Sequence, residues 1–212
     1  MPPGAKLCQL IDDPQTAAWT PLGIAAVGGV RLGLFDLLSR PAPRNRAAPR
    51  RCEPAPRVEA SSPMTAAFVL QTLAETRPSD SIIVEEAPSA RPAMQRHLPI
   101  TLSEGFCTMD SGGLGYGMPA AVGVALGKPG ARIIGVIGDG SSPYSIQALW
   151  SAARLKLPIT FVILNNRRYA ALQDFAGVFD FTQNEPVQGT ELPGLDFVAI
   201  ARGHGLRRLT RG

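Results

Sequence analysis

Two short polar motifs follow apolar, strand-length runs in the second half of the chain. The run 133–137 is followed by Gly138, Asp139, Gly140 and Ser141, and the run 159–164 is followed by the pair Asn165-Asn166. Twenty-four residues, 141–164, separate Gly140 from Asn165. A few carboxylate and carboxamide oxygens suit Mg²⁺, which commonly shares its ligands with substrate phosphates. The motifs therefore predict a metal and phosphate site, provided that the fold brings them together.

The elements that would position these motifs form a strand–helix–strand unit over residues 133–164. Both runs are continuously apolar, which is typical of parallel strands covered on both faces. Between them, residues 145–157 repeat apolar side chains at helical spacing, from Ile146 to Leu157. Parallel strands end at the same edge of a sheet, where open α/β folds bind ligands. We expect a helix that starts just after Gly140 to direct its N-terminal N–H groups toward the same edge.

Residues 63–212 alternate helical and strand patterns throughout. We expect a helix over 63–76 capped by Ser62, and a short strand over 81–84 that Glu85 and Glu86 terminate. A glycine-rich loop, 111–117, leads into a small-residue segment, 118–126, that suits a buried helix. The alternation predicts an α/β fold in which a parallel sheet carries helices on both faces.

Composition divides the chain into three stretches. Residues 1–39 contain an apolar, helix-like segment over 22–38, and we interpret them as the remnant of a preceding domain. Residues 40–62 are rich in arginine, proline and alanine and predict a linker. Residues 63–212 are the predicted ligand-binding domain.

Composition also limits the class of protein. The 212 residues, 45% hydrophobic and 18% charged, suit a globular domain and include no uncharged apolar run long enough to span a membrane. The three cysteines, Cys8, Cys52 and Cys107, are too far apart for a disulfide framework or a CxxC pair. We therefore expect a cytoplasmic, reducing environment and no membrane partner.

Positive charge is concentrated in the predicted linker. Six arginines and a single acid, Glu53, lie between Arg40 and Arg57, whereas the formal charge of the whole chain is +4. A nucleic-acid binder usually spreads basic residues over a folded face. The interspersed prolines favour a solvated linker over a binding arm, so we expect no nucleic-acid partner.

The motif GDG, followed about two dozen residues later by NN, resembles the signature of thiamine diphosphate enzymes. From about Met64 onward, the chain is similar to the C-terminal cofactor-binding domain of 2-keto acid decarboxylases of the benzoylformate decarboxylase type. The similarity extends over SGGLGYGMPAAVGVALG, VIGDGSSPYSIQALWSAARLKLPITFVILNN, RRYAALQDFAGVF and PGLDFVAIARGHG.

The resemblance implies a site for thiamine diphosphate and Mg²⁺. It implies that the side chains of Asp139 and Asn166 and the main-chain carbonyl of Arg168 hold the metal. The resemblance further implies cofactor contacts from Ser89, Gly112, Leu114, Asp139, Gly140, Ser141, Tyr144, Asn166 and Tyr169. Among these, Leu114 would lie under the cofactor and Gly112 would offer its carbonyl to the aminopyrimidine.

Three residues after the Asn pair match positions that line the substrate cavity of this family: Ala171, Leu172 and Phe175. An apolar, aromatic wall would favour an aryl or large aliphatic keto acid over pyruvate. Ordinary core packing is the alternative for Leu114, Leu172 and Phe175.

The implied activity is non-oxidative decarboxylation of a benzoylformate-like 2-keto acid to benzaldehyde and CO₂. A carboligase of the acetolactate synthase type and a cofactor-binding module without turnover are the alternatives. In the family, the activating glutamate belongs to the N-terminal domain of a neighbouring subunit in a homo-oligomer, for which a tetramer is expected. We therefore expect no catalytic residue in this chain, and a truncated domain in which 205–209 should lead into a strand.

Overall fold

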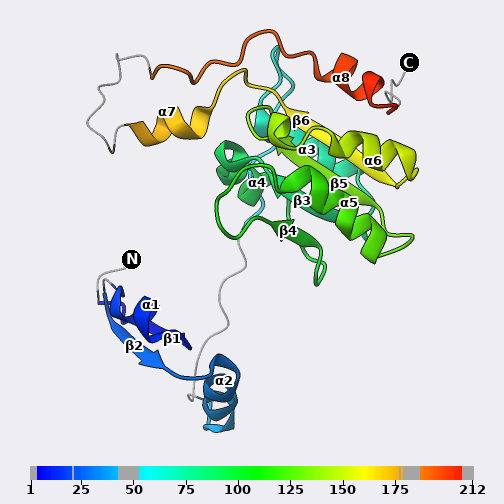
Figure 1. Ribbon diagram of the computed structural model, residues 1–212. Coiled ribbons are helices and arrows are strands. Elements are labelled where there is room, and N and C mark those ends of the chain that lie inside the picture. Colours follow the sequence, from blue (N-terminus) through cyan, green and yellow to red (C-terminus); the bar gives the residue numbers. More distant parts are fainter. Residues whose placement is uncertain (1–3, 21, 43–52, 177, 179–186, 207–212) are drawn as a thin grey trace. The chain divides into compact units, whose positions relative to one another are not determined.

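The structure, a computed structural model, describes residues 4–20, 22–42, 53–176, 178 and 187–206. These residues belong to two compact units, one within 1–52 and the other within 53–212 (Figure 1). Much of the arginine-rich stretch, including Arg44, Arg46, Arg50 and Arg51, lies outside the described residues.

The first unit contains a two-stranded parallel sheet of β1 (Cys8–Ile11) and β2 (Ile24–Val27). Helix α1 (Pro14–Ala18) connects the strands, and α2 (Val30–Ser39) follows them. None of the described residues 4–42 is buried. The prediction of one helix-like segment over 22–38 is wrong in its first part, because residues 24–27 pair with β1 and the helix begins only after Gly28-Gly29.

The second unit is built on a four-stranded sheet in the order β4-β3-β5-β6, in which every pairing is parallel. Its strands are β3 (Ile82–Glu86), β4 (Phe106–Thr108), β5 (Ile133–Gly138) and β6 (Ile159–Leu164). Strands β5 and β6 are neighbours, so the predicted strand–helix–strand unit is present and its strands end at the same edge. The predicted α/β fold is confirmed.

Helices cover both faces of this sheet, as the continuous burial of β3 requires. On one face, α3 (Ala66–Thr76) and α4 (Arg91–His97) pack Leu70 and Met94 against Ile83. On the other, α5 (Gly117–Gly127) packs Ala121 against Val84. Helix α6 (Ala148–Arg154) lies on the same side as α5. Helices α7 (Ala170–Ala176) and α8 (Phe197–Gly203) follow β6.

Helix α3 begins later than its sequence pattern predicts. Its N-cap is Thr65, whose hydroxyl accepts a hydrogen bond from the N–H of Phe68 at 3.2 Å. The predicted cap, Ser62, lies three residues upstream, in a segment without helical structure. The capping hydroxyl therefore sets the start of the helix more strongly than the proline that precedes it.

Strand β3 continues through the two glutamates that were predicted to end it. Glu85 and Glu86 are both 0% exposed and extend the pairing of β3 with β5. The prediction is wrong because both carboxylates find hydrogen-bond donors within the fold, which offsets the cost of burying them.

The segment after Gly140 also differs from the prediction. Residues Ser142–Tyr144 form a 3₁₀ turn that contains Pro143, and α6 begins only at Ala148. The expected helix N-terminus directly after Gly140 is therefore wrong.

The described cysteines form no disulfide with each other. Cys8 and Cys107 are free, and Cys52 lies outside the described residues. The expected strand after 205–209 falls mostly on residues outside the described part. Among the residues that the structure describes, no helix has the length and apolar character needed to cross a membrane.

Candidate functional site

The two polar motifs meet at the carboxyl edge of the sheet. The N–H of Asp139 donates to the carbonyl of Leu164 at 3.1 Å, so the first turn after β5 is bonded to the end of β6. The N–H of Arg167 donates to Oδ2 of Asp139 at 2.5 Å, across 28 residues of sequence. The structure thus brings the GDG and NN motifs together, as their spacing predicts.

Asp139 is held in one orientation by two backbone N–H groups. It is 3% exposed. Its Oδ1 accepts from Gly140 N at 2.9 Å, while Oδ2 accepts from Arg167 N. Because each carboxylate oxygen has two lone pairs, both oxygens keep capacity to bind a cation.

The Asn pair shapes the loop that follows β6. Asn165 Oδ1 accepts from Arg167 N at 3.2 Å, and Asn166 Oδ1 accepts from Arg168 N at 3.1 Å. Arg167 has a φ of +59°, in the left-handed region that residues other than glycine rarely adopt. The turn directs the Arg167 N–H at Asp139 and brings Asn166 and Arg168 close to the same strand ends.

A later segment of the chain, residues 190–192, holds this loop although it contains no recognisable motif. Tyr169 N donates to Thr190 O at 2.7 Å, and Leu192 N donates to Arg167 O at 2.8 Å. These bonds flank an antiparallel bridge between Arg168 and Glu191. The strand-end loop therefore depends on residues 190–192, which contain no charge pattern or spacing typical of a site.

Two tyrosines cover the glycines of the site. A Cβ on Gly140 would lie 2.6 Å from the ring of Tyr169, and one on Gly115 would lie 3.2 Å from the Cβ of Tyr144. Both glycines thus allow close approach of an aromatic side chain. Burial raises the pKa of the Tyr169 phenol, and its hydrogen bond with Tyr144 and the nearby Asp139 carboxylate raise it further.

The glycine-rich loop lies beside the turn after β5. Gly115 contacts Tyr144, as described above, and the carbonyl of Glu86 in β3 would lie 3.6 Å from a Cβ on Gly138. Gly112 has a φ of +76° and open space around it, and Leu114 is partly exposed. The structure therefore places the predicted residues of 111–117 and 138–144 around one edge of the sheet.

Two other predicted cofactor contacts lie near the ends of β3 and β5. Ser89 belongs to a 3₁₀ turn, Pro88–Ala90, that begins one residue after β3, and it is exposed. Ser141 is buried, and its N–H donates to Gly138 O at 3.1 Å. Neither position contradicts a contact with the cofactor, and both roles remain predictions.

The predicted substrate-wall residues lie on α7. Leu172 is 57% exposed and Phe175 is 55% exposed, and Ala171 is exposed as well. This exposure argues against core packing as the explanation for Leu172 and Phe175. Their role in a substrate wall stays a prediction.

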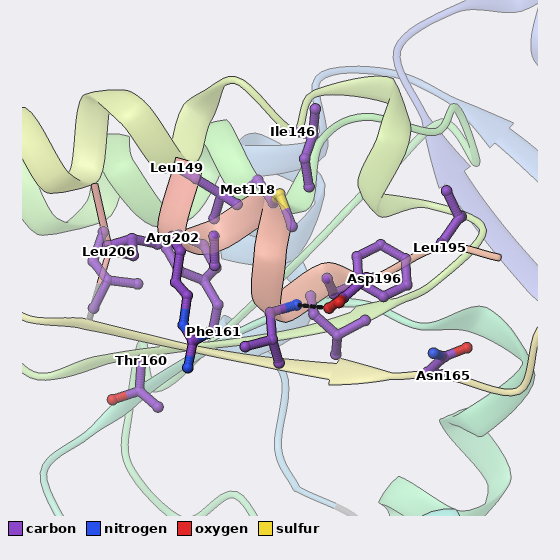
Figure 2. Close-up of a pocket in the computed structure, with 15 residues that line it drawn as sticks. Met118, Ile146, Leu149, Thr160, Phe161, Asn165, Leu195, Asp196, Arg202 and Leu206 are labelled. Atoms are coloured by element: carbon purple, nitrogen blue, oxygen red, sulfur yellow. Dashed lines mark hydrogen bonds between the residues drawn. The ribbon is translucent and has the colours of Figure 1, made fainter. Parts of the chain in front are cut away.

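A cavity of about 660 Å³ lies away from these residues, between β6 and α8 (Figure 2). Its lining is mostly apolar and includes Leu149, Phe161 and Leu206, with Arg202 from α8. Asn165 contributes to it, but none of the predicted metal, cofactor or substrate residues does. The cavity is therefore not the site that the motifs form.

The donors at the strand ends fit a hard cation. In the part of the chain that the structure describes, no three His, Cys, Asp or Glu side chains gather to hold a metal ion. The candidate ligands are instead one carboxylate, one carboxamide and one main-chain carbonyl, on Asp139, Asn166 and Arg168. Such a small set of oxygen donors suits Mg²⁺, which retains waters or phosphate oxygens in its remaining positions.

Comparison with known families matches this part of the chain. Residues 90–211 match the family model described as the thiamine pyrophosphate enzyme, C-terminal TPP binding domain. The match covers β4, β5, β6 and the strand-end loops.

Individual relatives match more of the chain. Benzoylformate decarboxylase of Pseudomonas aeruginosa is 40% identical over 210 residues, which cover 99% of this chain and 39% of that enzyme. The large subunit of acetolactate synthase isozyme 2 of Escherichia coli is 28% identical over 142 residues, covering 66% of this chain and 26% of that protein. The chain thus spans about two fifths or less of the length of these relatives.

Solved structures show the same similarity. The benzoylformate decarboxylase from Polynucleobacter necessarius superposes with a TM-score of 0.87 at 33% identity, covering 99% of this chain and 40% of that chain. The thiamine diphosphate-dependent 4-hydroxybenzoylformate decarboxylase of Rhodococcus jostii superposes with a TM-score of 0.84 at 36% identity, covering 98% and 39%.

Proposed function

Because the chain belongs to the thiamine pyrophosphate enzymes, through their C-terminal cofactor-binding domain, we propose that it binds thiamine diphosphate with Mg²⁺ for non-oxidative decarboxylation of an aryl 2-keto acid. The observation that carries the proposal is the bond from Arg167 N to the buried Asp139, which joins the two motifs at one sheet edge. The names of the Pseudomonas and Rhodococcus relatives support a substrate of the benzoylformate class.

Asp139, Asn166 and the carbonyl of Arg168 would hold the metal ion. Gly140, Ser141, Tyr144, Tyr169 and Ser89 would surround the diphosphate, while Gly112 and Leu114 would contact the rest of the cofactor. The two N–H groups on Asp139 fix its carboxylate before any ligand arrives, so little reorganisation is needed on binding.

Decarboxylation of a 2-keto acid needs a nucleophilic carbon and an electron sink, which thiamine diphosphate supplies when bound. The residues of this chain would orient that group and exclude water from it. Leu172 and Phe175 present apolar surface on α7, directly after the metal loop, where an aryl group could pack.

We further propose that residues 1–39 derive from a middle domain, 40–62 link it, and 63–212 form the cofactor-binding domain. The partner would be the N-terminal domain of a neighbouring subunit, which would supply the activating glutamate in a homo-oligomer. The division of the chain into units at 52/53 supports a boundary in this region.

A carboligase of the acetolactate synthase type is the second candidate, and the Escherichia coli relative supports it. The two activities differ in product, because a decarboxylase releases benzaldehyde from benzoylformate whereas a carboligase releases acetolactate from pyruvate. Product analysis with both keto acids separates them.

Thermal unfolding of the chain with thiamine diphosphate, with and without Mg²⁺, tests the proposal. Ligand at about a hundred times its Kd should stabilise the fold by about 2.7 kcal/mol, or a rise of several degrees in Tm. Asp139→Ala should abolish the Mg²⁺-dependent part of this rise. Asp80→Ala, an exposed aspartate at the opposite end of β3, should retain it.

A shift that does not depend on Mg²⁺, or that survives in Asp139→Ala, would contradict the proposed metal site. A folded chain that shows no shift at all would contradict binding by this chain.

A further inference from the structure

Two adjacent glutamates of β3 are buried on opposite faces of the sheet. Glu85 and Glu86 are both fully buried, although an isolated buried carboxylate is strongly destabilising. Successive side chains of a strand point to opposite faces, so the two residues contact different elements. One of them, Glu86, reaches the glycine-rich loop.

Glu86 accepts two hydrogen bonds from the backbone of this loop. Its Oε1 accepts from Gly115 N at 2.5 Å, and its Oε2 accepts from Gly117 N at 2.6 Å. The donors lie 29 and 31 residues further along the chain. Bonds from N–H groups to a carboxylate are stronger than those to a neutral acceptor, so both ends of 115–117 are held to β3.

The contact is close as well as polar. A Cβ on Gly117 would lie 2.7 Å from the Cβ of Glu86, so the loop backbone packs directly on this side chain. Gly117 is also the first residue of α5, whose N-terminal N–H groups lack partners within the helix. Glu86 therefore occupies the place at this helix end that an anionic ligand could otherwise take.

The first part of the loop, residues 111–114, is more exposed than the part that Glu86 holds. Gly112 has nothing near the position of a Cβ, and Leu114 is 36% exposed. The loop is thus anchored at 115–117, while the residues predicted to contact the cofactor face away from protein packing.

We propose that Glu86 is a positioning residue for thiamine diphosphate, an inference that rests on the proposed function. Its carboxylate fixes Gly115 and Gly117, and thereby sets the place of Gly112 and Leu114 before the cofactor binds. Because the Glu86 carboxylate already binds the N-terminus of α5, we expect the diphosphate to bind on the Asp139 side of the site instead.

Glu85 provides a matched control in the same strand. It is equally buried, and its carboxylate accepts from Ala87 N at 2.6 Å, Arg91 Nε at 3.1 Å and Thr108 Oγ1 at 2.6 Å. These partners lie in the turn after β3, in α4 and in β4. A substitution at Glu85 removes a buried carboxylate without removing an anchor of the loop.

The experiment compares Glu86→Gln and Glu85→Gln in the full chain by two measurements. Residue-resolved amide hydrogen exchange without ligand reports the loop, and calorimetric titration with thiamine diphosphate and Mg²⁺ reports affinity. A carboxamide cannot accept on both of its heavy atoms, so Glu86→Gln should speed exchange at Gly115 and Gly117 at least tenfold and raise the Kd about tenfold. Glu85→Gln should leave both quantities near wild type.

Equal effects of the two variants on exchange or on Kd would overturn the proposal, as would unchanged exchange at 115 and 117 in Glu86→Gln. If the wild-type chain fails to bind thiamine diphosphate, the proposed function fails and the cofactor part of this inference fails with it. The exchange measurement still decides whether Glu86 positions the loop. Should Glu86→Gln not fold, Glu86→Asp, which keeps the charge but withdraws it by one methylene, decides by the same two measurements.

Discussion

The two units of the chain each place an aspartate just beyond a parallel strand, with different results. In the first unit, Asp13 follows β1, is exposed, and accepts from the N–H groups of Gln15 and Thr16 as the N-cap of α1. In the second unit, Asp139 follows β5, is buried, and joins its own turn to the loop after β6. The same residue type in the same topological place thus makes a helix cap or a candidate ligand site.

The difference is explained by what surrounds the strand end. Among its described residues, the first unit has a two-stranded sheet and no buried residue, and the hydrogen bonds of Asp13 go to nearby residues of the chain. In both units a neighbouring parallel strand ends beside the first, but the described helices of the second unit cover both faces of its sheet. The carboxylate of Asp139 is therefore buried and reaches the loop after β6, whereas that of Asp13 stays exposed and binds the next residues of its own helix.

Substitution of a leucine by alanine should change the free energy of unfolding of the two units by very different amounts, and this is the largest effect that we expect. Leu70 is 0% exposed in α3, whereas Leu34 in α2 is 50% exposed. Leu70→Ala should lower the free energy of unfolding of the second unit by about 2–5 kcal/mol. Leu34→Ala should change the first unit by less than about 1 kcal/mol.

Urea unfolding followed by NMR signals from each unit measures both values. A cost for Leu34→Ala as large as that for Leu70→Ala would contradict this prediction, because it would mean that the first unit buries Leu34 in solution.

Glycine-to-alanine substitutions at the strand ends provide a second test, with a smaller expected change in the free energy of unfolding. A Cβ on Gly140 would meet the Tyr169 ring at 2.6 Å, whereas a Cβ on Gly28, after β2, has nothing within 4 Å. Gly140→Ala should therefore destabilise the second unit by about 1–3 kcal/mol through overpacking. Gly28→Ala should not destabilise the first unit.

Urea unfolding of the two variants provides the measurement, and the NMR signals of Tyr169 should shift only in Gly140→Ala. Equal tolerance of alanine at the two positions would show that Tyr169 does not pack on the turn.

The smallest expected effect is a pH dependence confined to α1. The hydrogen bond from the Thr16 hydroxyl, followed by the backbone bonds from Gln15 and Thr16, holds the pKa of Asp13 below its usual value. A pKa lowered by folding stabilises the helix above the unfolded value, and this contribution is lost as pH falls through the folded value. Thr16→Ala should raise the pKa of Asp13.

Carboxyl NMR titration of the wild type and of Thr16→Ala measures that change. Ser39→Ala, which removes an exposed hydroxyl from α2, is the control and should leave the pKa of Asp13 where it is. A pKa that stays low in Thr16→Ala would assign the effect to the backbone donors alone.

The sequence predicted those features that depend on local pattern. Strand β6 has the predicted bounds, 159–164, because a continuous apolar run lies between Pro158 and Asn165. The proximity of Asp139 to the Asn165-Asn166 segment could be predicted from the parallel topology alone, because β5 and β6 end at the same edge of the sheet. The prediction of one helix-like segment over 22–38 is wrong because its glycines allow either a strand or a helix, and pairing with β1 selects a strand over 24–27.

What the sequence could not predict depends on partners that are distant along the chain. From the sequence alone, Glu86 is expected to end the strand, because a charged side chain is rarely buried. In the structure the N–H groups of Gly115 and Gly117 donate to its carboxylate and so allow its burial. Residues 190–192 carry no motif, yet they hold the loop that contains Arg168. Tertiary hydrogen bonds override the local preference at both places.

The long reach of these bonds also fixes the order in which the site can assemble. The hydrogen bond to Glu86 comes from Gly117, 31 positions later in the chain, and the bond to Asp139 comes from Arg167, 28 positions later. Closing such loops costs chain entropy before any contact compensates for it, so non-local contacts of this kind form slowly. On a ribosome, the loop after β6 would lack its last hydrogen bond until Leu192 had been added and released from the exit tunnel. The strand-end site therefore takes shape only after residues 190–192 have left the ribosome.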